Sequence, residues 1–271
     1  MSRFFTTELA EQAGLQLITV KSNALKRRAD LTVFQPKGTE ASINLPVVIL
    51  LHGVYGSHWA WTAKGAVHRT AQALIDQGAI KPMLLVMPSD GLFGDGSGYV
   101  PHRQEDYEAW IIDDVIGVIR EQFTCVGPTS QLFITGLSMG GFGALRLGAK
   151  YPHLFSAFSG LSSITHFTQL SQFVQDFSAL QKAAIEQDGV LDWMLTHKTS
   201  LPPFRFDCGT EDNLLAANRA LHQRLLAHQI PHTYDEFTGG HSWDYWQKHI
   251  GQTLRFFNQH SRVLSDWRLS G

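Results

Sequence analysis

Cysteine is scarce in this chain, which has only Cys125 and Cys208 among its 271 residues. Two cysteines cannot build a framework of disulfides, so a small secreted fold held together by such bridges is excluded. Both lie in or beside apolar segments, where a buried free thiol is the common state of cysteine. The sequence therefore predicts a reducing compartment and a cytoplasmic protein.

Charge of one sign is not in excess either. Lys and Arg together number 22 and Asp and Glu 24, which gives a formal net charge of -2. Nucleic acids and anionic membrane surfaces attract proteins with a clear basic excess. We therefore expect no nucleic acid and no membrane as a main partner.

Long apolar runs are also missing. The longest, residues 45–51, is far shorter than the roughly 20 residues of a membrane-spanning helix. Residues 1–14 contain no continuous apolar stretch, so they do not predict a signal peptide. Hydrophobic residues still make up 44% of the chain and charged residues 17%, which suits a large buried core. We expect one folded domain over residues 1–271.

Short apolar runs alternate with amphipathic segments along most of the chain. The runs that predict strands are residues 15–20, 31–35, 45–51, 83–87, 132–135, 204–208 and 233–237. The segments that predict helices are residues 67–77, 105–123, 140–150, 213–228 and 243–258. This alternation predicts an α/β fold with a mostly parallel sheet that helices cover on both faces. The first two runs predict a hairpin around Asn23, which adds antiparallel strands at one edge.

Residues 162–201 do not follow this alternation. They carry Phe167, Phe173, Phe177 and Trp193 in amphipathic helical spacing and contain no strand-like run. We expect a helical insertion above the sheet. A lid over a site and a pair of ordinary packing helices both fit this pattern, and the two do not exclude each other.

The run at 132–135 is followed by Gly136-Leu-Ser-Met-Gly140, which has the G-x-S-x-G pattern. A serine in this pattern lies on a very tight turn between a strand and a helix, where the flanking residues pass so close that only small ones fit. The turn exposes the hydroxyl and places the helix N-terminus beneath developing negative charge. A strand before the pattern and a helix after it strengthen the match, so Ser138 is the candidate nucleophile.

A serine hydroxyl needs a base, and the base needs a group that orients it. In this fold the order along the chain is Ser, then an acid, then His, each after a strand. Glu211 and Asp212 follow the run at 204–208, and His241 follows the last run through two glycines. We prefer Asp212 to Glu211, because a shorter carboxylate is more easily held against an imidazole.

An oxyanion hole requires two backbone N–H groups. The first is expected from Met139, directly after the nucleophile. The second is expected from Val54, because Gly53 at the end of the run at 45–51 lets the backbone turn inward.

Aromatic residues near these loops are candidates for substrate contacts. Trp59 and Trp61 follow the loop that contains Val54, and Tyr99 ends a glycine-rich loop after the run at 83–87. For both tryptophans, burial in the core is an equally good interpretation. We expect that glycine-rich loop to edge the cleft. It lacks the lysine of a P-loop and the acid spacing of a calcium loop.

A metal site is not expected. His228 and His232 are four residues apart, but Pro231 interrupts a shared helix face and no acidic or thiol ligand clusters nearby.

Four stretches together resemble the esterase D-type group of α/β-hydrolases, which includes S-formylglutathione hydrolases, small-ester esterases, feruloyl esterases and mycolyltransferases. They are Leu50-Leu-His-Gly53, Gly136-Leu-Ser-Met-Gly-Gly-Phe-Gly-Ala-Leu145, Cys208-Gly-Thr-Glu-Asp212 and Gly240-His-Ser-Trp243. The opening hairpin is similar as well. The resemblance implies an α/β-hydrolase fold in which Ser138 is the nucleophile, Asp212 the acid and His241 the base. It also implies Val54 and Met139 as oxyanion donors.

Within this group the chain is most similar to the small-acyl carboxylesterases. Its loop Gly53-Val-Tyr-Gly-Ser57 differs from the Gly-Leu-Thr-Cys type of the S-formylglutathione hydrolases. We therefore expect a serine carboxylesterase that acts on a small-molecule ester and needs neither a metal nor an organic cofactor. A thioester hydrolase, an acyltransferase with the same triad, and a non-catalytic binding protein on the same fold are the alternatives.

Overall fold

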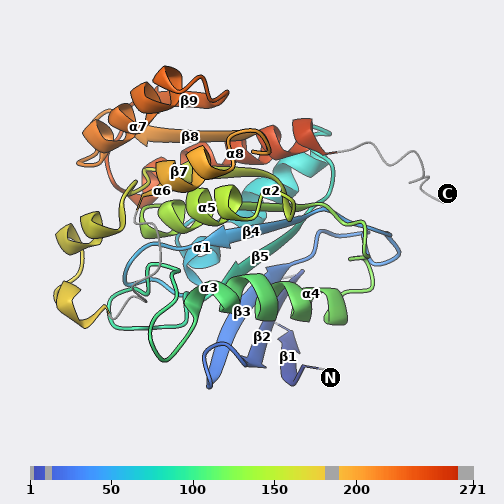
Figure 1. Ribbon diagram of the computed structural model, residues 1–271. Helices are drawn as coiled ribbons and strands as arrows, with labels where there is room; N and C mark the ends of the chain where they lie inside the picture. Colours follow the sequence, from blue (N-terminus) through green and yellow to red (C-terminus); the bar gives the residue numbers. More distant parts are fainter. Residues whose placement is uncertain (1–2, 10–13, 181–188, 262–271) are drawn as a thin grey trace.

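A nine-stranded sheet forms the centre of the protein in the computed structural model, which describes residues 3–9, 14–180 and 189–261 (Figure 1). The strands are β1 Phe5–Leu9, β2 Leu15–Lys21, β3 Arg28–Phe34, β4 Val47–Leu51, β5 Leu84–Pro88, β6 Leu132–Gly136, β7 Phe155–Leu161, β8 Phe204–Gly209 and β9 Thr233–Phe237. Their order is β1-β2-β3-β5-β4-β6-β7-β8-β9. Strands β4 to β9 pair with one another in parallel. Strands β1 to β3 form antiparallel pairs at one edge of the sheet, and β3 joins β5 in an antiparallel pair. The predicted α/β fold with an opening hairpin is confirmed.

Two strands were not predicted, β1 and β7. In β7 two serines and a glycine interrupt the apolar residues, so the local pattern is not that of a strand. The strand forms because β6 and β8 pair with it on both sides. Position in the sheet therefore decides its conformation more than its composition does.

The helices are α1 Ala60–Ala63, α2 Val67–Asp76, α3 Tyr107–Ala109, α4 Ile116–Gln122, α5 Met139–Lys150, α6 Val190–Thr196, α7 Leu215–Ala227 and α8 Trp243–His260. The predicted helix over residues 105–123 consists of α3, a wider π-helical segment at Trp110–Val115 and α4. The Asp106 carboxylate accepts hydrogen bonds from the Glu108 and Ala109 N–H groups, and so begins this helix as an N-cap. None of the described helices has the length and the apolar character needed to cross a bilayer.

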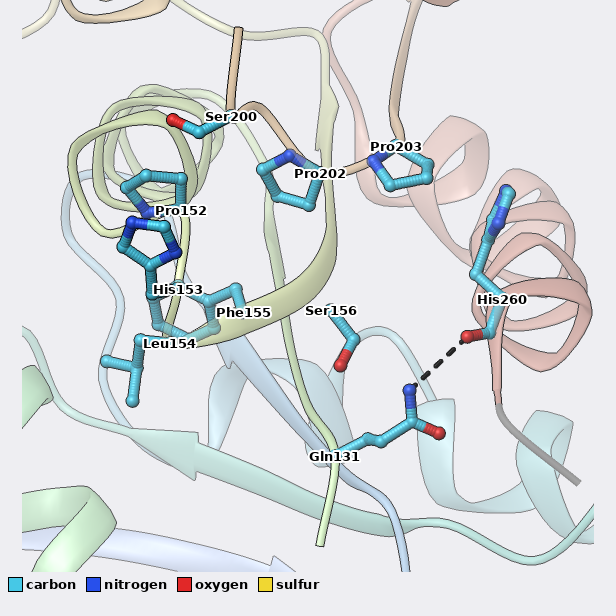
Figure 2. Close-up of a pocket in the computed structure, with 10 residues that line it drawn as sticks. All are labelled: Gln131, Pro152, His153, Leu154, Phe155, Ser156, Ser200, Pro202, Pro203 and His260. Carbon is cyan, nitrogen blue, oxygen red and sulfur yellow. Dashed lines mark hydrogen bonds between the residues drawn. The ribbon is translucent and has the colours of Figure 1, made fainter. Parts of the chain in front are cut away.

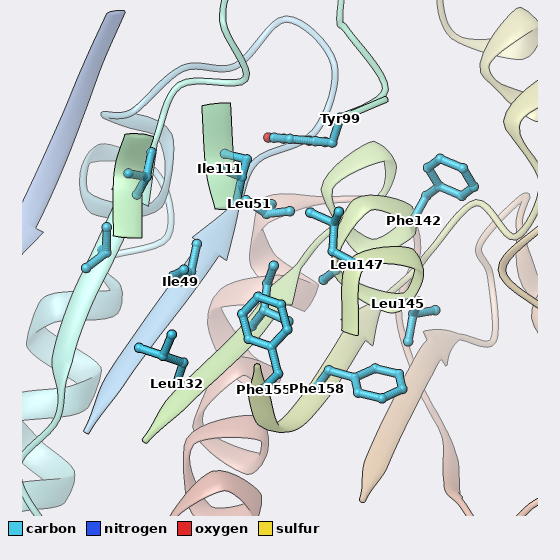
Figure 3. Packing of buried hydrophobic residues seen from close by; sticks show 14 of the residues in the cluster. Ile49, Leu51, Tyr99, Ile111, Leu132, Phe142, Leu145, Leu147, Phe155 and Phe158 are labelled. Atoms are coloured by element: carbon cyan, nitrogen blue, oxygen red, sulfur yellow. The ribbon is translucent and has the colours of Figure 1, made fainter. Parts of the chain in front are cut away.

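The apolar core has two layers, one on each face of the sheet. In β4, Val47, Ile49 and Leu51 face one layer, whereas Val48 and Leu50 face the other. The first layer includes α5 and the helix at 107–122 (Figure 3). The second lies under α2 and α8. A central strand with both faces buried must be apolar throughout, which explains the unbroken run at 45–51.

The insertion at residues 162–201 contains 3-10 turns at Phe167–Gln172 and Phe177–Ala179 and the helix α6; residues 181–188 lie outside the described part. Helix α6 packs on α5. There the Trp193 ring lies over the ammonium group of Lys150, 4.8 Å from the ring centroid, and near the guanidinium of Arg146. These cation–π contacts join the C-terminal part of the insertion to the main core.

Candidate active site

The turn between β6 and α5 has the strained geometry that its sequence predicts. Ser138 has φ 54° and ψ -118°, which is outside the regions that residues with a side chain favour. A Cβ atom on Gly136 would overlap with the backbone of Gly140, so both positions require glycine. Neighbouring strands and a buried helix hold this turn, and they keep the hydroxyl of Ser138 at the carboxyl edge of the sheet.

Replacing Gly140 with alanine is expected to destabilise the protein. The new Cβ would overlap with the carbonyl oxygens of Leu51 and His52, and backbone atoms cannot move aside as a flexible side chain can. We expect Gly140→Ala to lower the free energy of unfolding by about 3 kcal/mol, measured by urea denaturation.

Gly251→Ala is the matched control for this prediction. Gly251 lies inside α8, and its added Cβ would meet only side-chain carbons at 3.7 and 3.8 Å. Since alanine favours a helix over glycine, this variant should gain about 0.5–1 kcal/mol. Equal stability of Gly140→Ala and the unchanged protein would contradict the close approach at the turn.

The structure brings together the three side chains that the sequence separates by 74 and 29 positions. The Nε2 atom of His241 lies 2.9 Å from the Oγ atom of Ser138. The Nδ1 atom of the same ring lies 2.9 Å from the Oδ2 atom of Asp212. Glu211 is exposed and makes no such contact among the described residues, so the geometry favours Asp212 of the two acids.

Asp212 is held in a buried and directed position. Its second oxygen, Oδ1, accepts a hydrogen bond from the Leu214 N–H at 2.8 Å. Burial alone would raise the pKa of the Asp212 carboxyl, but the hydrogen bonds from His241 and Leu214 stabilise the charged form and lower the pKa below its usual value. An ionised Asp212 accepts from an Nδ1–H group, which leaves the Nε2 lone pair of His241 free to face the Ser138 hydroxyl.

The expected oxyanion donors flank the serine. Met139 is the first residue of α5, so its N–H has no acceptor within the helix. Gly53 lies against the turn, because a Cβ there would be 2.9 Å from Leu137 and 3.4 Å from the Cβ of Ser138. Val54 follows directly, and no bond from its N–H is found among the described residues. The role of the Val54 and Met139 N–H groups as oxyanion donors stays a prediction.

Two aromatic residues differ from the expectation of substrate contact. Tyr99 is completely buried, and its hydroxyl donates a hydrogen bond to the His52 carbonyl at 3.0 Å. Trp61 is buried too, and its Nε1–H donates to the Leu51 carbonyl at 3.0 Å. Both support the backbone at the end of β4 and do not line a cleft. Trp59 is 40% exposed at the start of α1, and a contact with substrate stays a prediction.

His52 and Asp90 are supporting residues that the sequence did not reveal as such. The His52 Nδ1–H donates to the Gly53 carbonyl at 2.7 Å, and its Nε2 accepts from the Asp90 N–H at 2.9 Å. The Asp90 carboxylate in turn accepts from the Leu92 and Ser97 N–H groups. The glycine-rich loop after β5 is therefore bonded to the loop that carries Val54.

Two further rings flank His241, Phe173 from the insertion and Trp246 from α8. Neither was predicted, since only the folded chain brings them near residue 241.

A separate hollow of about 450 Å³ lies at the other end of the sheet (Figure 2). Its lining residues include Gln131, Phe155 and Pro203, which stand at or just before the starts of β6, β7 and β8. The triad stands beyond the opposite ends of strands in the same sheet. Ligands of open α/β sheets bind at the carboxyl ends of the strands, so this hollow is not the candidate active site.

Comparison with known proteins agrees with this geometry. Residues 22–257 match the model of a protein family described as "Putative esterase". The chain belongs to this esterase family. It is 27% identical over 237 residues to an acetyl esterase of Caldicellulosiruptor saccharolyticus. The matched region covers 80% of this chain and 85% of the relative. The predicted resemblance to esterase D-type hydrolases is thereby confirmed, and the protein is an ester hydrolase.

Solved structures extend the comparison to the fold of this esterase. A ferulic acid esterase superimposes with a TM-score of 0.79 at 23% identity, covering 96% of this chain and 100% of the other. An S-formylglutathione hydrolase from Agrobacterium tumefaciens gives 0.74 at 19% identity, with 96% and 99% covered. At these identities the likeness concerns the fold. It confirms the α/β-hydrolase architecture.

Proposed function

We propose that this esterase is a serine carboxylesterase that hydrolyses small-acyl esters through an acyl-enzyme on Ser138. The observation that supports it most directly is the continuous chain of hydrogen-bond distances from Ser138 through His241 to Asp212. A hydroxyl, an imidazole and an ionised carboxylate in this order can activate an alcohol as a nucleophile at neutral pH.

In the first half of the reaction, Ser138 Oγ bonds to the ester carbonyl carbon while its proton moves to Nε2 of His241. The Asp212 carboxylate holds the imidazole in the required tautomer and stabilises the imidazolium. The N–H groups of Val54 and Met139 then face the carbonyl oxygen as it becomes negative, and two such donors contribute about 3 kcal/mol or more to transition-state stabilisation.

The tetrahedral intermediate collapses when the bond to the alcohol oxygen breaks and His241 gives its proton to that oxygen. Water then attacks the acyl carbon with the same histidine as base, and the acid and free Ser138 are released. Every bond and proton is accounted for by the three side chains and water. The proposed reaction therefore needs no metal and no organic cofactor.

A small acyl group suits the surroundings of the nucleophile. Ser138 is only 3% exposed, and the rings of Phe173 and Trp246 contact the proposed base, His241. The curated relative named acetyl esterase supports the same choice. We further propose one catalytic domain over residues 1–271, with the insertion at 162–201 as a cover of the site. The free thiols of Cys125 and Cys208 support the predicted cytoplasmic location.

A panel of esters that share p-nitrophenol as leaving group tests the substrate proposal. We expect kcat/KM to be highest for acetyl to butyryl esters and to fall roughly 10-fold or more for octanoyl, because a long chain must displace the aromatic cover. S-formylglutathione and a feruloyl ester complete the panel, and added alcohols reveal any acyl transfer. A clear preference for the thioester, or for transesterified product, would replace the proposal by the corresponding alternative.

A further inference from the structure

A contact outside the triad joins His241 to the insertion. The Phe173 ring stacks on the His241 imidazole, with 5.5 Å between ring centroids and 22° between planes. On α8, the Trp246 ring meets the same imidazole edge-on, at 5.0 Å and 88°. His241 thus contacts one buried ring from α8 and one ring supplied by the insertion.

The backbone at Phe173 is itself attached to the loop that carries Val54. The Tyr55 hydroxyl donates to the Phe173 carbonyl at 2.5 Å. The Tyr55 N–H donates to the Asp95 carbonyl at 2.9 Å, and the Asp95 carboxylate accepts from the Gln175 N–H at 2.7 Å. We call these three hydrogen bonds the Tyr55–Asp95 clasp. It ties the insertion to the loops after β4 and β5.

We propose that Phe173 is a positioning residue for His241, and that the Tyr55–Asp95 clasp holds it in place. The inference rests on the proposed function, because it assigns Phe173 a role in the orientation of the proposed base. The bond to Asp212 fixes one atom of the imidazole but leaves the ring free to tilt, since the outer torsion of histidine is broad. A ring stacked on its face removes that freedom.

The stacked geometry also suits the charged state of the base. When His241 takes the proton of Ser138, the imidazolium lies next to the π system of Phe173 in an offset stack, with 5.5 Å between the ring centroids, which is within the roughly 6 Å of a cation–π contact. The contact is thus stronger in the transition state than before it, so its loss should lower kcat more than it changes KM.

The experiment compares three single variants on p-nitrophenyl acetate. Phe173→Leu keeps apolar volume but removes the ring, and we expect kcat to fall roughly 10-fold with KM changed less than about 3-fold. Phe173→Tyr keeps the ring and should retain kcat within about 3-fold. Phe177→Leu is the matched control, since Phe177 packs on Phe167 in the same insertion, and it should leave both constants unchanged.

Tyr55→Phe tests the clasp, because it removes only the hydroxyl that holds Phe173. We expect a loss of kcat of about 3-fold in this variant, and no further loss when it is added to Phe173→Leu, since both act through one contact. If Phe173 had a purely structural role, its replacement would lower the amount of folded enzyme, and the two substitutions would not share one loss of kcat.

The outcomes separate the two proposals. Suppose that the unchanged protein is active. If Phe173→Leu then keeps the kcat of the unchanged protein, or if Phe173→Tyr lowers kcat as much as Phe173→Leu does, the positioning role is overturned and the proposed function is not. Fully additive effects of Tyr55→Phe and Phe173→Leu overturn the clasp. If the unchanged protein hydrolyses no ester and a fluorophosphonate leaves Ser138 unlabelled, the proposed function itself fails.

Discussion

Ser138→Ala is expected to lower kcat/KM for p-nitrophenyl acetate by about 10³-fold or more, and to leave only the residual rate that the oxyanion donors and substrate binding supply. The substitution removes the atom that would bond to the acyl carbon, and in the described part of the chain no other hydroxyl is hydrogen-bonded to the His241 ring. Alanine fits the space of the serine side chain, so the turn between β6 and α5 and the free energy of unfolding should change little. Steady-state kinetics with urea denaturation on the same sample checks both expectations.

Labelling with a fluorophosphonate provides an independent measurement. The unchanged protein should bind one equivalent at Ser138, identified by mass spectrometry of the labelled peptide, because the probe reacts with an activated serine. Ser171→Ala is the matched control, since Ser171 is an exposed serine of the insertion whose hydroxyl donates to the Thr168 carbonyl. Labelling that persists in Ser138→Ala would show that another residue is the nucleophile.

The sequence predicted the triad because each member directly follows a recognisable strand. Ser138, Asp212 and His241 come after β6, β8 and β9, and the carboxyl ends of parallel strands meet at one edge of a sheet. Pairing order was not needed for this inference. The missing β7 changed which strands are neighbours, yet it left all three side chains at the same edge.

The aromatic residues could not be assigned in the same way. Tyr99 and Trp61 follow strands just as pocket residues do, and only packing decides that their polar atoms bond to backbone carbonyls. The position of Phe173 depends on how the insertion folds back over the sheet, and its helical spacing contains no such information. Local sequence patterns therefore do not predict contacts between segments that are distant in the chain.

The acid of the triad has a distinct signature in stability. Because its pKa in the folded protein is lowered relative to the unfolded value near 3.9, the ionised Asp212 stabilises the fold above that value. This contribution is lost as the pH falls through the folded pKa. The difference in unfolding free energy between the unchanged protein and Asp212→Asn should therefore have its largest value at pH 7 and decrease as the pH is lowered through the folded pKa of Asp212.

Asp212→Asn should also lower kcat/KM by about 10³- to 10⁴-fold at pH 7, although the two side chains have the same shape. An amide NH₂ group facing Nδ1 would oppose an Nδ1–H, so the imidazole must take the other tautomer. Its Nε2 then carries a hydrogen and cannot accept the proton of Ser138. Glu211→Gln is the matched control, since it neutralises the exposed neighbouring carboxylate, and it should keep nearly full activity. A large loss in Glu211→Gln with little in Asp212→Asn would instead make Glu211 the acid and require the loop after β8 to rearrange.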